Sequence, residues 1–396
     1  PSEIDGATSP AVFTEGAGVG DAKQGYLGDC YFLSALSVMS ERPTALKRVF
    51  VSTVYAVSHG VVTVCFYVNG SPRYITIDTR LPLRDEDSAL IFAQSVDPNE
   101  LWVPLLEKAW AKLYHSYGAI EGGLAHQSIA AMTGGFPSSV DATRAEAADG
   151  RLWAKIKRQV SDDCLLCASS SVGEERDETK EHPEPVDPAG IVGGHAYGVL
   201  KTVEVDGLRL LQLRNPWGCK EWTGDFSDKS HKWTNRLRRK LAVEDKDEGI
   251  FWMSVDDFAS HFRAVGACRL FDDKKWRVQS LQVDFAARGG KAAGGKRGSP
   301  TYCNNPQILL KTKKSDAKVF ATFSVPRSAS GDIEHYVLVE VRDGDVLLKM
   351  GKTRRTSTYH QTRCVTKSGS YCNADASLDF VLKGRKTCIL VPSLWD

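Results

Sequence analysis

The chain has 396 residues, of which 42% are hydrophobic and 25% are charged, and its 51 basic and 49 acidic side chains leave a formal net charge of +2. This length predicts two or three domains, and the composition excludes an intrinsically disordered chain. The balanced charge argues against a strongly basic nucleic-acid-binding surface, so we expect no nucleic-acid partner.

The longest apolar run, Val61–Val68, has the length of a β-strand and is far too short for a membrane span. The first residues include Glu3 and Asp5 and lack the apolar stretch of a secretory signal. Because the first residue is Pro1 and not Met, we expect a fragment of a longer protein.

Ten cysteines are spread thinly along a chain that is large enough to fold without disulfides. This usage favours a reducing, intracellular location. The closest pair, Cys164 and Cys167, lies in an apolar stretch without a second pair nearby, so a buried strand is favoured over a zinc or redox site.

Helical and strand patterns alternate along the first third of the chain. Residues 30–40 predict a helix that is apolar on most sides and therefore central, and residues 100–114 predict a second helix with one apolar face. Between them, 61–68 and 73–78 have the pattern of two strands of a hairpin. Thr133-Gly134-Gly135 breaks the pattern and marks the first domain boundary.

The middle of the chain contains a predicted helix over about 145–160 and the strand that starts at Cys164. Two strands, 195–205 and 208–214, follow around Asp206-Gly207, and 251–262 predicts a short helix.

Beyond a stretch rich in Gly, Ala, Lys and Arg, short strands at regular spacing predict an all-β sandwich. The predicted strands are 307–311, 319–325, 336–341, 346–349, 378–382 and 388–391. Because the chain stops directly after an apparent core strand, we expect this domain to be truncated. The basic residues 288–299 favour a solvated linker, with contact to an anionic membrane as the open alternative.

A first motif with chemical potential is Gln24-Gly-Tyr-Leu-Gly-Asp-Cys30, at the start of the apolar helix. A cysteine at a helix N-terminus faces backbone N–H groups and the positive end of the helix dipole, which both favour the thiolate. Gln24 lies six residues earlier, within reach to donate its amide to a developing oxyanion. Taken alone, Cys30 fits a nucleophile and a small buried hydrophobic residue equally well, and Asp29 fits a helix N-cap.

A second motif places His195, in Gly-Gly-His-Ala-Tyr, twenty residues before Asn215, in Asn-Pro-Trp-Gly. A strict two-residue turn at Asp206-Gly207 would put the two side chains on opposite faces of the hairpin. We therefore expect an odd-numbered loop or a bulge at this turn, which lets Asn215 orient the imidazole while Trp217 shields their hydrogen bond from water. A thiol, an imidazole and an amide form the Cys-His-Asn set of papain-like catalysis.

On these motifs the chain resembles the calpain family of cysteine proteases. The stretches QGYLGDCYFLSAL, GGHAYGVL and RNPWG are similar to the three catalytic motifs of the family. Further matches occur in family order between about residues 11 and 310: NELWVPLLEKAWAK, EGG before TGG, EWTGDFSD, EGIFWMSVDDF, and AGG followed by NNPQ. Tyr31 departs from the pattern, because the family usually has Trp after the nucleophile.

The resemblance implies a role for each matching position. Cys30 corresponds to the nucleophile, His195 to the general base and acid, Asn215 to its orienting partner and Gln24 to the oxyanion donor. The backbones of two further residues would flank the substrate peptide, Gly123 and Gly194.

The resemblance also implies Ca²⁺ sites that align two lobes of the protease core. In the first lobe the matching ligands are the carbonyls of Thr14 and Gly16 and the carboxylates of Asp21 and Glu100. Oxygen ligands of this kind suit a hard cation, and the set is complete.

In the second lobe the matching ligands are Glu221, Asp228, Glu248 and the carbonyl of Lys246, but Ile250 occupies the position of the last carboxylate. Losing one carboxylate predicts a weak site or none. No sequence with the ligand spacing of an EF-hand loop is present, so calcium regulation would act through the core itself.

We therefore expect an α+β protein with a papain-like core of two lobes, residues 1–134 and 135–276, followed by a C2-like β-sandwich over 277–396. The expected function is calcium-dependent limited proteolysis of protein substrates in the cytoplasm, with anionic membrane as a further partner of the sandwich. No regulatory subunit is identified. The alternatives are a calpain-like scaffold with attenuated proteolysis, which the intact catalytic residues argue against, and a transglutaminase-like acyl transferase, which the flanking motifs argue against.

Overall fold

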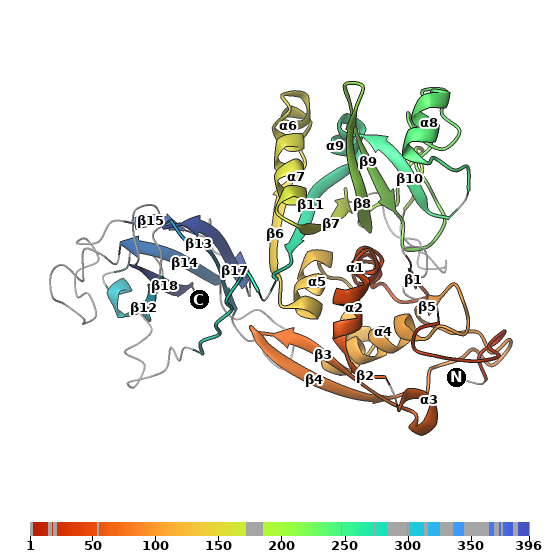
Figure 1. Ribbon diagram of the computed structural model, residues 1–396, viewed down its shortest axis with the longest axis horizontal. Helices are drawn as coiled ribbons and strands as arrows, with labels where there is room; N and C mark the ends of the chain where they lie inside the picture. The colour runs from red at the N-terminus through yellow and green to blue at the C-terminus, as the bar shows by residue number, and fades with distance from the viewer. Residues whose placement is uncertain are drawn as a thin grey trace. The chain divides into compact units, whose positions relative to one another are not determined.

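The computed structural model describes residues 3–14, 18, 22–53, 55–171, 185–246, 248–272, 274–282, 299, 301–312, 316–324, 336–343, 364–367, 372–373, 375–382 and 387–395. The chain divides into two compact units (Figure 1). The first contains residues 1–67 and 72–272, and the second contains 68–71 and 273–396. Within the described ranges, no helix is both long and apolar enough to cross a bilayer.

The first part of the larger unit is mainly helical. Its helices are α1 (Cys30–Ser40), α2 (Pro43–Val49), α3 (Ala56–His59), α4 (Trp102–Leu113), the 3-10 helix η1 (Gly118–Ile120) and α5 (Ala125–Thr133). Its strands are β1 (Ala22–Lys23), β2 (Phe50–Ser52), β3 (Val61–Val68), β4 (Ser71–Asp78) and β5 (Gln94–Ser95). Strands β2, β3 and β4 form one small sheet, and β1 pairs with β5.

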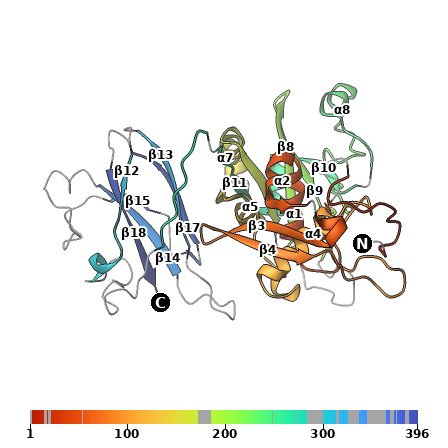
Figure 2. The same ribbon diagram turned by 60° about the horizontal axis from the view of Figure 1, so that its bottom comes forward.

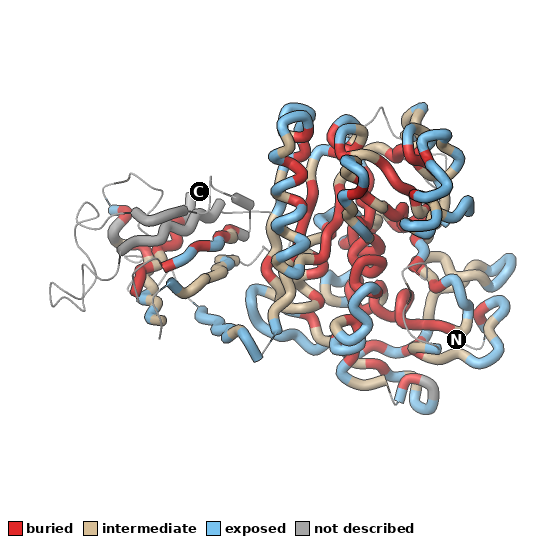
Figure 3. The backbone as a smooth tube through the Cα atoms, turned by 45° about the horizontal axis from the view of Figure 1, so that its top comes forward, coloured by how far each residue is buried: buried red, intermediate tan, exposed pale blue. Residues whose placement is uncertain are grey.

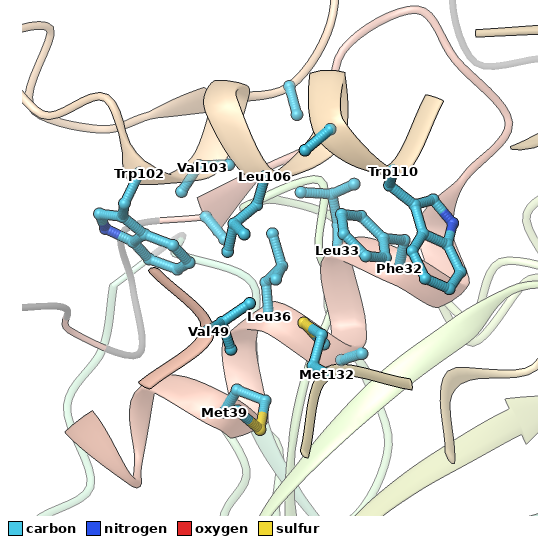
Figure 4. Close-up of a cluster of buried hydrophobic side chains, with 14 of the residues drawn as sticks. Phe32, Leu33, Leu36, Met39, Val49, Trp102, Val103, Leu106, Trp110 and Met132 are labelled. Atoms are coloured by element: carbon cyan, nitrogen blue, oxygen red, sulfur yellow. The ribbon is translucent and has the colours of Figure 1, made fainter. Parts of the chain in front are cut away.

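Helix α1 is the centre of this part, as its apolar sequence predicts. Every residue of the helix after Cys30 is buried, which Figure 3 shows as a continuous red segment. Phe32 of α1 stacks on Trp110 of α4 with ring centroids 5.0 Å apart, and Leu33 and Leu36 lie in the same cluster (Figure 4). A helix without a polar face needs partners on all sides, and α2, α4 and α5 supply several of them.

The second part is built on a six-stranded antiparallel sheet with strand order β10-β9-β8-β7-β11-β6. Its strands are β6 (Phe136–Asp141), β7 (Cys164–Ser170), β8 (Ala196–Val205), β9 (Leu208–Arg214), β10 (Ile250–Ser254) and β11 (Phe262–Arg269). Its helices are α6 (Arg144–Ala148), α7 (Arg151–Ser161), α8 (Asn235–Leu241) and α9 (Val255–His261).

The two faces of this sheet belong to different cores. Leu165 and Cys167 of β7 pack into the core around α1, whereas Leu166 and Ala168 pack into a second core that includes α7 and α9. This alternation is the two-residue period of a strand buried on both faces. Cys164 and Cys167 therefore lie in a buried strand, and both are free thiols.

The hairpin of β8 and β9 differs from its predicted form. Its turn is a strict two-residue turn, because Val205 pairs with Leu208, and Asp206 and Gly207 both have positive φ, at 50° and 79°. An odd loop at this turn is therefore wrong, since Asp-Gly suits the tight type I′ turn equally well. The register shifts instead within β8, between Val199 and Lys201.

This bulge at Leu200 has the effect that the odd loop was expected to have. Beyond it Gly198 pairs with Arg214, so the next pair in register places Asn215 opposite Tyr197. Tyr197 lies two residues after His195, on the same face of the strand. The bulge therefore turns Asn215 toward the face of His195.

Helix α1 lies directly on β8, and Figures 1 and 2 show the two elements side by side. The Ser34 hydroxyl donates to the Ala196 carbonyl at 2.8 Å. Farther along both elements, a Cβ on Gly198 would lie only 3.0 Å from Val38 Cγ1. Glycine at position 198 thus allows the helix to approach the strand closely.

The smaller unit consists of antiparallel strands. They are β12 (Ile308–Lys311), β13 (Lys318–Ser324), β14 (Tyr336–Asp343), β15 (Cys364–Lys367), β16 (Cys372–Asn373), β17 (Asp375–Val381) and β18 (Thr387–Trp395), with the 3-10 helix η2 (Tyr302–Asn304). One sheet has the order β12-β18-β14-β15, and β13 pairs with β17. Leu378, Phe380, Cys388 and Leu310 from both sheets share one core, but the complete C2-like sandwich stays a prediction.

Several predicted elements differ in detail. The single helix expected over 145–160 is two helices, α6 and α7, separated at Gly150, whose φ is 82°. The helix expected over 251–262 is strand β10 followed by α9, because Phe251 and Trp252 point into different cores as strand residues do. The predicted strand 346–349 and nearly all of the basic stretch 288–299 lie outside the described residues.

The close approach of α1 and β8 can be tested with Gly198→Val. Valine favours strands, yet its side chain would collide with Val38, so we expect a loss of about 1–3 kcal/mol in unfolding free energy. Denaturant titration measures this loss, and combining Gly198→Val with Val38→Ala should recover part of it. Gly118→Ala is the matched control, because a Cβ there meets nothing within 4 Å. A Gly198→Val protein as stable as the parent would contradict the contact.

Candidate active site

Cys30 is the first residue of α1 and is half-buried. The loop before it lies against the segment that precedes β5, where Tyr26 N–H donates to the Ile91 carbonyl at 3.2 Å. Gly25 is required at this point, because a Cβ there would lie 2.4 Å from the Phe92 carbonyl oxygen. The start of α1 thus projects from a loop whose path is fixed by backbone contacts.

His195 lies one residue before β8 and has only 2% of its surface exposed. Ser170, at the end of the neighbouring β7, holds its backbone in place. The Ser170 hydroxyl accepts from His195 N–H at 2.8 Å, and the Ser170 N–H donates to the His195 carbonyl at 2.9 Å. The imidazole ring also meets the Tyr197 ring edge-on, with centroids 5.1 Å apart.

Asn215 follows β9 and reaches His195 across the hairpin, with 2.9 Å between Asn215 Oδ1 and His195 Nε2. The amide orientation is fixed by its other partners, because Nδ2 donates to the Lys220 carbonyl at 3.1 Å and Oδ1 accepts from Trp217 N–H at 3.1 Å. An acceptor oxygen facing Nε2 requires a proton on that nitrogen. In the neutral imidazole the lone pair is therefore on Nδ1.

Trp217 covers this hydrogen bond. Its ring centroid lies 4.8 Å from that of His195, and the side chain is 2% exposed. Asn215 itself is fully buried. The His195–Asn215 bond is thus placed in a region of low dielectric constant, where a hydrogen bond is electrostatically stronger than in water.

The helix that begins at Cys30 and the strand that follows His195 run side by side. Ser34 contacts Ala196, and Val38 contacts Gly198, so α1 and β8 run in the same direction. Four helical residues advance about 6 Å and two strand residues about 6.6 Å, so the two elements stay in step. One turn before Ser34 is Cys30, which therefore lies beside the segment that ends in His195.

Gln24 is buried, with 4% of its surface exposed. Its backbone N–H donates to the Pro216 carbonyl at 3.0 Å, next to Asn215. Its side-chain Nε2 donates to the Leu27 carbonyl at 2.7 Å, which uses one of the two amide hydrogens. The second amide hydrogen remains for a ligand.

Gly123 and Gly194 are both exposed. A Cβ on Gly123 would lie 2.5 Å from the Tyr31 ring, so this glycine packs flat on the residue after Cys30. The Tyr31 hydroxyl in turn donates to the Ile120 carbonyl at 3.0 Å and accepts from Trp110 Nε1 at 3.1 Å. The Tyr31 side chain thus fixes the backbone at Ile120, shortly before Gly123.

Two residues that hold the site were not singled out from the sequence. Ser170 is one of several consecutive serines, and its role in holding His195 becomes apparent only from the pairing of β7 with β8. Arg214 is 1% exposed, and its Nη1 donates to the Ala22 carbonyl at 2.8 Å and to Ser37 Oγ at 2.6 Å. A buried arginine directly before Asn215 thereby ties β9 to α1 and to the strand before Gln24.

The first-lobe calcium positions are described in part. Thr14 N–H lies 3.4 Å from Glu100 Oε1, and Glu100 is a buried carboxylate whose Oε2 accepts from Trp102 Nε1 at 2.9 Å. These two predicted ligands are therefore adjacent, which fits a shared oxygen site. Gly16 and Asp21 lie outside the described residues.

The second-lobe positions are also close together but face backbone donors. Glu221 Oε1 accepts from the N–H groups of Glu248 and Gly249 at 3.0 and 2.8 Å, and Asp228 Oδ2 faces Lys246 N–H at 3.3 Å. One oxygen of each carboxylate thus faces backbone N–H groups, and the weak or absent second-lobe Ca²⁺ site stays a prediction. Over the described ranges, no group of three or more His, Cys, Asp or Glu residues could hold a metal ion.

Comparison with known proteins shows which family has this arrangement. A family model described as calpain family cysteine protease matches residues 1–269. The calpain-type cysteine protease DEK1 of Arabidopsis thaliana is 40% identical over 316 residues, which cover 78% of this chain and 14% of that protein. The calpain-2 catalytic subunit of Bos taurus is 32% identical over 336 residues, or 80% of this chain and 45% of that protein.

Calpain-9 of Rattus norvegicus is 33% identical over 344 residues, which cover 82% of this chain and 47% of that protein. The chain therefore spans less than half the length of these relatives. The family model covers well over half of this chain and includes Cys30, His195 and Asn215. The chain belongs to the calpain family of cysteine proteases.

Proposed function

We propose that the chain is an endopeptidase that uses Cys30, His195 and Asn215 as its catalytic triad. The observation that supports this proposal is the buried 2.9 Å contact between His195 Nε2 and Asn215 Oδ1, together with the packing of the helix that begins at Cys30 on the strand that follows His195. An orienting amide on one ring nitrogen leaves the other nitrogen to exchange a proton with a nucleophile.

In this mechanism His195 Nδ1 accepts the proton of the Cys30 thiol, and the thiolate sulfur attacks a substrate carbonyl carbon. The backbone N–H of Cys30 and the second amide hydrogen of Gln24 stabilise the tetrahedral oxyanion. The imidazolium then protonates the leaving amine, which breaks the peptide bond and leaves a thioester. Water, deprotonated by His195, hydrolyses the thioester and releases the thiol.

We infer that the substrate is an extended segment of a protein. Gly123, which packs on Tyr31 next to Cys30, and Gly194, next to His195, are exposed, and a Cβ on Gly194 would meet nothing within 4 Å. Exposed backbone of this kind pairs with the main chain of a peptide, and such pairing needs an unfolded substrate. The scaffold alternative has no comparable support, because the hydrogen bonds that orient His195 are all in place.

We further propose that Ca²⁺ regulates the activity through the first lobe, where Thr14, Gly16, Asp21 and Glu100 would hold it. The adjacency of Thr14 and the buried Glu100 carboxylate supports this site. Bound calcium would neutralise the buried Glu100 carboxylate. The expectation of a cytoplasmic location and of membrane contact stays a prediction.

Replacing the nucleophile gives the first test of the triad. Cys30→Ala should lower the rate of hydrolysis of an unstructured protein substrate by at least about a thousandfold, because no other group can form the thioester. Cys65→Ala is the matched control, since Cys65 is a free, half-buried thiol on β3, outside the site. Hydrolysis that persists in the Cys30→Ala protein would refute the mechanism.

The regulatory proposal is tested by calcium titration of the hydrolysis rate. Glu100→Gln removes a carboxylate but keeps a polar side chain, so we expect at least about tenfold more calcium for half-maximal activity. Glu248→Gln, at an exposed second-lobe position, should not move this midpoint. Equal midpoints for Glu100→Gln and the parent would remove the first-lobe site. Equal rates with calcium and with a chelator would remove calcium regulation altogether.

A further inference from the structure

Two buried carboxyl groups lie beneath the nucleophile, and the mechanism above uses neither of them. Asp29 directly precedes Cys30 and has no exposed surface, and Glu107, in the middle of α4, is 1% exposed. The two buried carboxyl groups are close neighbours, since each shifts the pKa of the other. Asp29 occupies the N-cap position of α1, but its side chain makes no capping hydrogen bond.

The partners of these groups determine how many protons they hold. Both Glu107 oxygens lie near Ala93 N–H, at 3.0 and 3.2 Å, whereas neither Asp29 oxygen has an N–H or hydroxyl donor in the described part of the chain. Two carboxyl groups can form a hydrogen bond only when one of them is protonated. A protonated Glu107 satisfies the whole set, because its hydroxyl donates to Asp29 and its other oxygen accepts from Ala93.

The burial of the two groups also assigns the proton to Glu107. Removal from water raises the pKa of Asp29 to about 7, and burial together with the charge of Asp29 raises the pKa of Glu107 well above its usual range. No nearby positive charge offsets the cost of burying a carboxylate here. Glu121 is acidic, and no lysine or arginine is among the described groups that act on the pair.

Other titratable groups also face the pair. Tyr117, just before η1, and Tyr31, on α1, both have raised pKa values, mainly through burial and partly through the charge of Asp29. Both hydroxyls are therefore neutral around pH 7, and neither supplies a charge that could balance a second carboxylate.

Glu107 also joins the two segments that define the start of α1. Through Ala93 N–H it holds the segment just before β5, and through Asp29 it holds the last residue of the nucleophile loop. These segments also contact each other directly, because Tyr26 N–H donates to the Ile91 carbonyl, and the strands next to them, β1 and β5, are paired. The acid pair thus lies where loop, strand and helix meet.

We propose that Asp29 and Glu107 share one proton, and that this buried acid pair positions the N-terminus of α1 and places a titratable negative charge beside the Cys30 thiol. The proposal rests on the proposed role of Cys30 as nucleophile. Asp29 and Glu107 are positioning residues, since neither touches the reacting atoms.

The sign of the effect follows from the charge of Asp29. Above about pH 7 Asp29 is ionised, and a negative charge on the residue next to Cys30 disfavours the thiolate form of its thiol. Below that pH the pair is neutral and has no such effect. The charge of Asp29 therefore shifts to higher pH any ionisation in the site that occurs above about pH 7. Ionisations at lower pH are unchanged.

The experiment is the pH profile of Cys30 alkylation by iodoacetamide, measured on the Cys30 peptide by mass spectrometry, so that it does not depend on proteolysis. In Asp29→Asn we expect the inflections of the alkylation profile above about pH 7 to move to lower pH by about 0.5–1 pH unit. Inflections at lower pH should not move. Glu121→Gln is the control, because this exposed neighbouring carboxylate is screened by water and should shift the profile much less.

A second measurement detects the shared proton itself. At pH 8, where ordinary carboxyl groups are ionised, the infrared spectrum should contain the band of a protonated carboxyl, and Glu107→Gln should remove it. The glutamine amide can donate to Asp29 and its oxygen can accept from Ala93, so this variant should keep the stability of the parent. Glu107→Met, which offers no donor, should unfold at lower denaturant concentration.

Two results would overturn the proposal. If the infrared spectra of the parent and of Glu107→Gln are the same, no proton is shared. If Asp29→Asn leaves the alkylation profile unchanged, or shifts its low-pH and high-pH steps equally, Asp29 does not supply a titratable charge at Cys30. Either result would leave the triad itself intact, since Cys30→Ala tests the triad independently.

Discussion

The site depends on the contact between α1 and β8. The helix carries Cys30 at its first residue, the strand follows His195, and Gly198 lets the backbones of helix and strand approach closely. Helix α1 lies in one core and β8 contributes to two, because one face of the sheet packs on α1 and the other on α7 and α9. The geometry of the proposed triad therefore depends on how the helical part packs on the sheet, and the buried Arg214 strengthens the same junction.

Much of this arrangement could be predicted from the sequence. The apolar run after Cys30 required a central helix, and Asp206-Gly207 required a hairpin between His195 and Asn215. The position of the bulge was not predictable, because Leu200 has no feature that distinguishes it from its neighbours on β8. The presence of a turn could be inferred from two residues, whereas the turn type was predicted wrongly and the register depends on the packing of the whole strand against β7 and β9.

The acidic residues were the hardest to interpret from the sequence. Glu107 lies in a helix beside lysines at 108 and 112, where a surface carboxylate is the ordinary expectation, yet it is almost completely buried. Glu221 and Asp228 matched calcium ligands by position, but their oxygens accept backbone hydrogen bonds. A carboxylate has the same letter in the sequence whether it binds a cation, an N–H group or a proton, and only its surroundings decide which.

Gly249 links two of these features. With φ at 78° it donates its N–H to the Glu221 carboxylate, while its carbonyl accepts from Asn215 N–H at 2.8 Å. A Cβ at this position would lie 2.8 Å from the Asn215 carbonyl oxygen. The two peptide units that flank this single glycine therefore connect the Glu221 carboxylate to the backbone of Asn215, whose side chain contacts the imidazole. Any side chain added at Gly249 would displace both partners together, so Glu221 and Asn215 are mechanically linked.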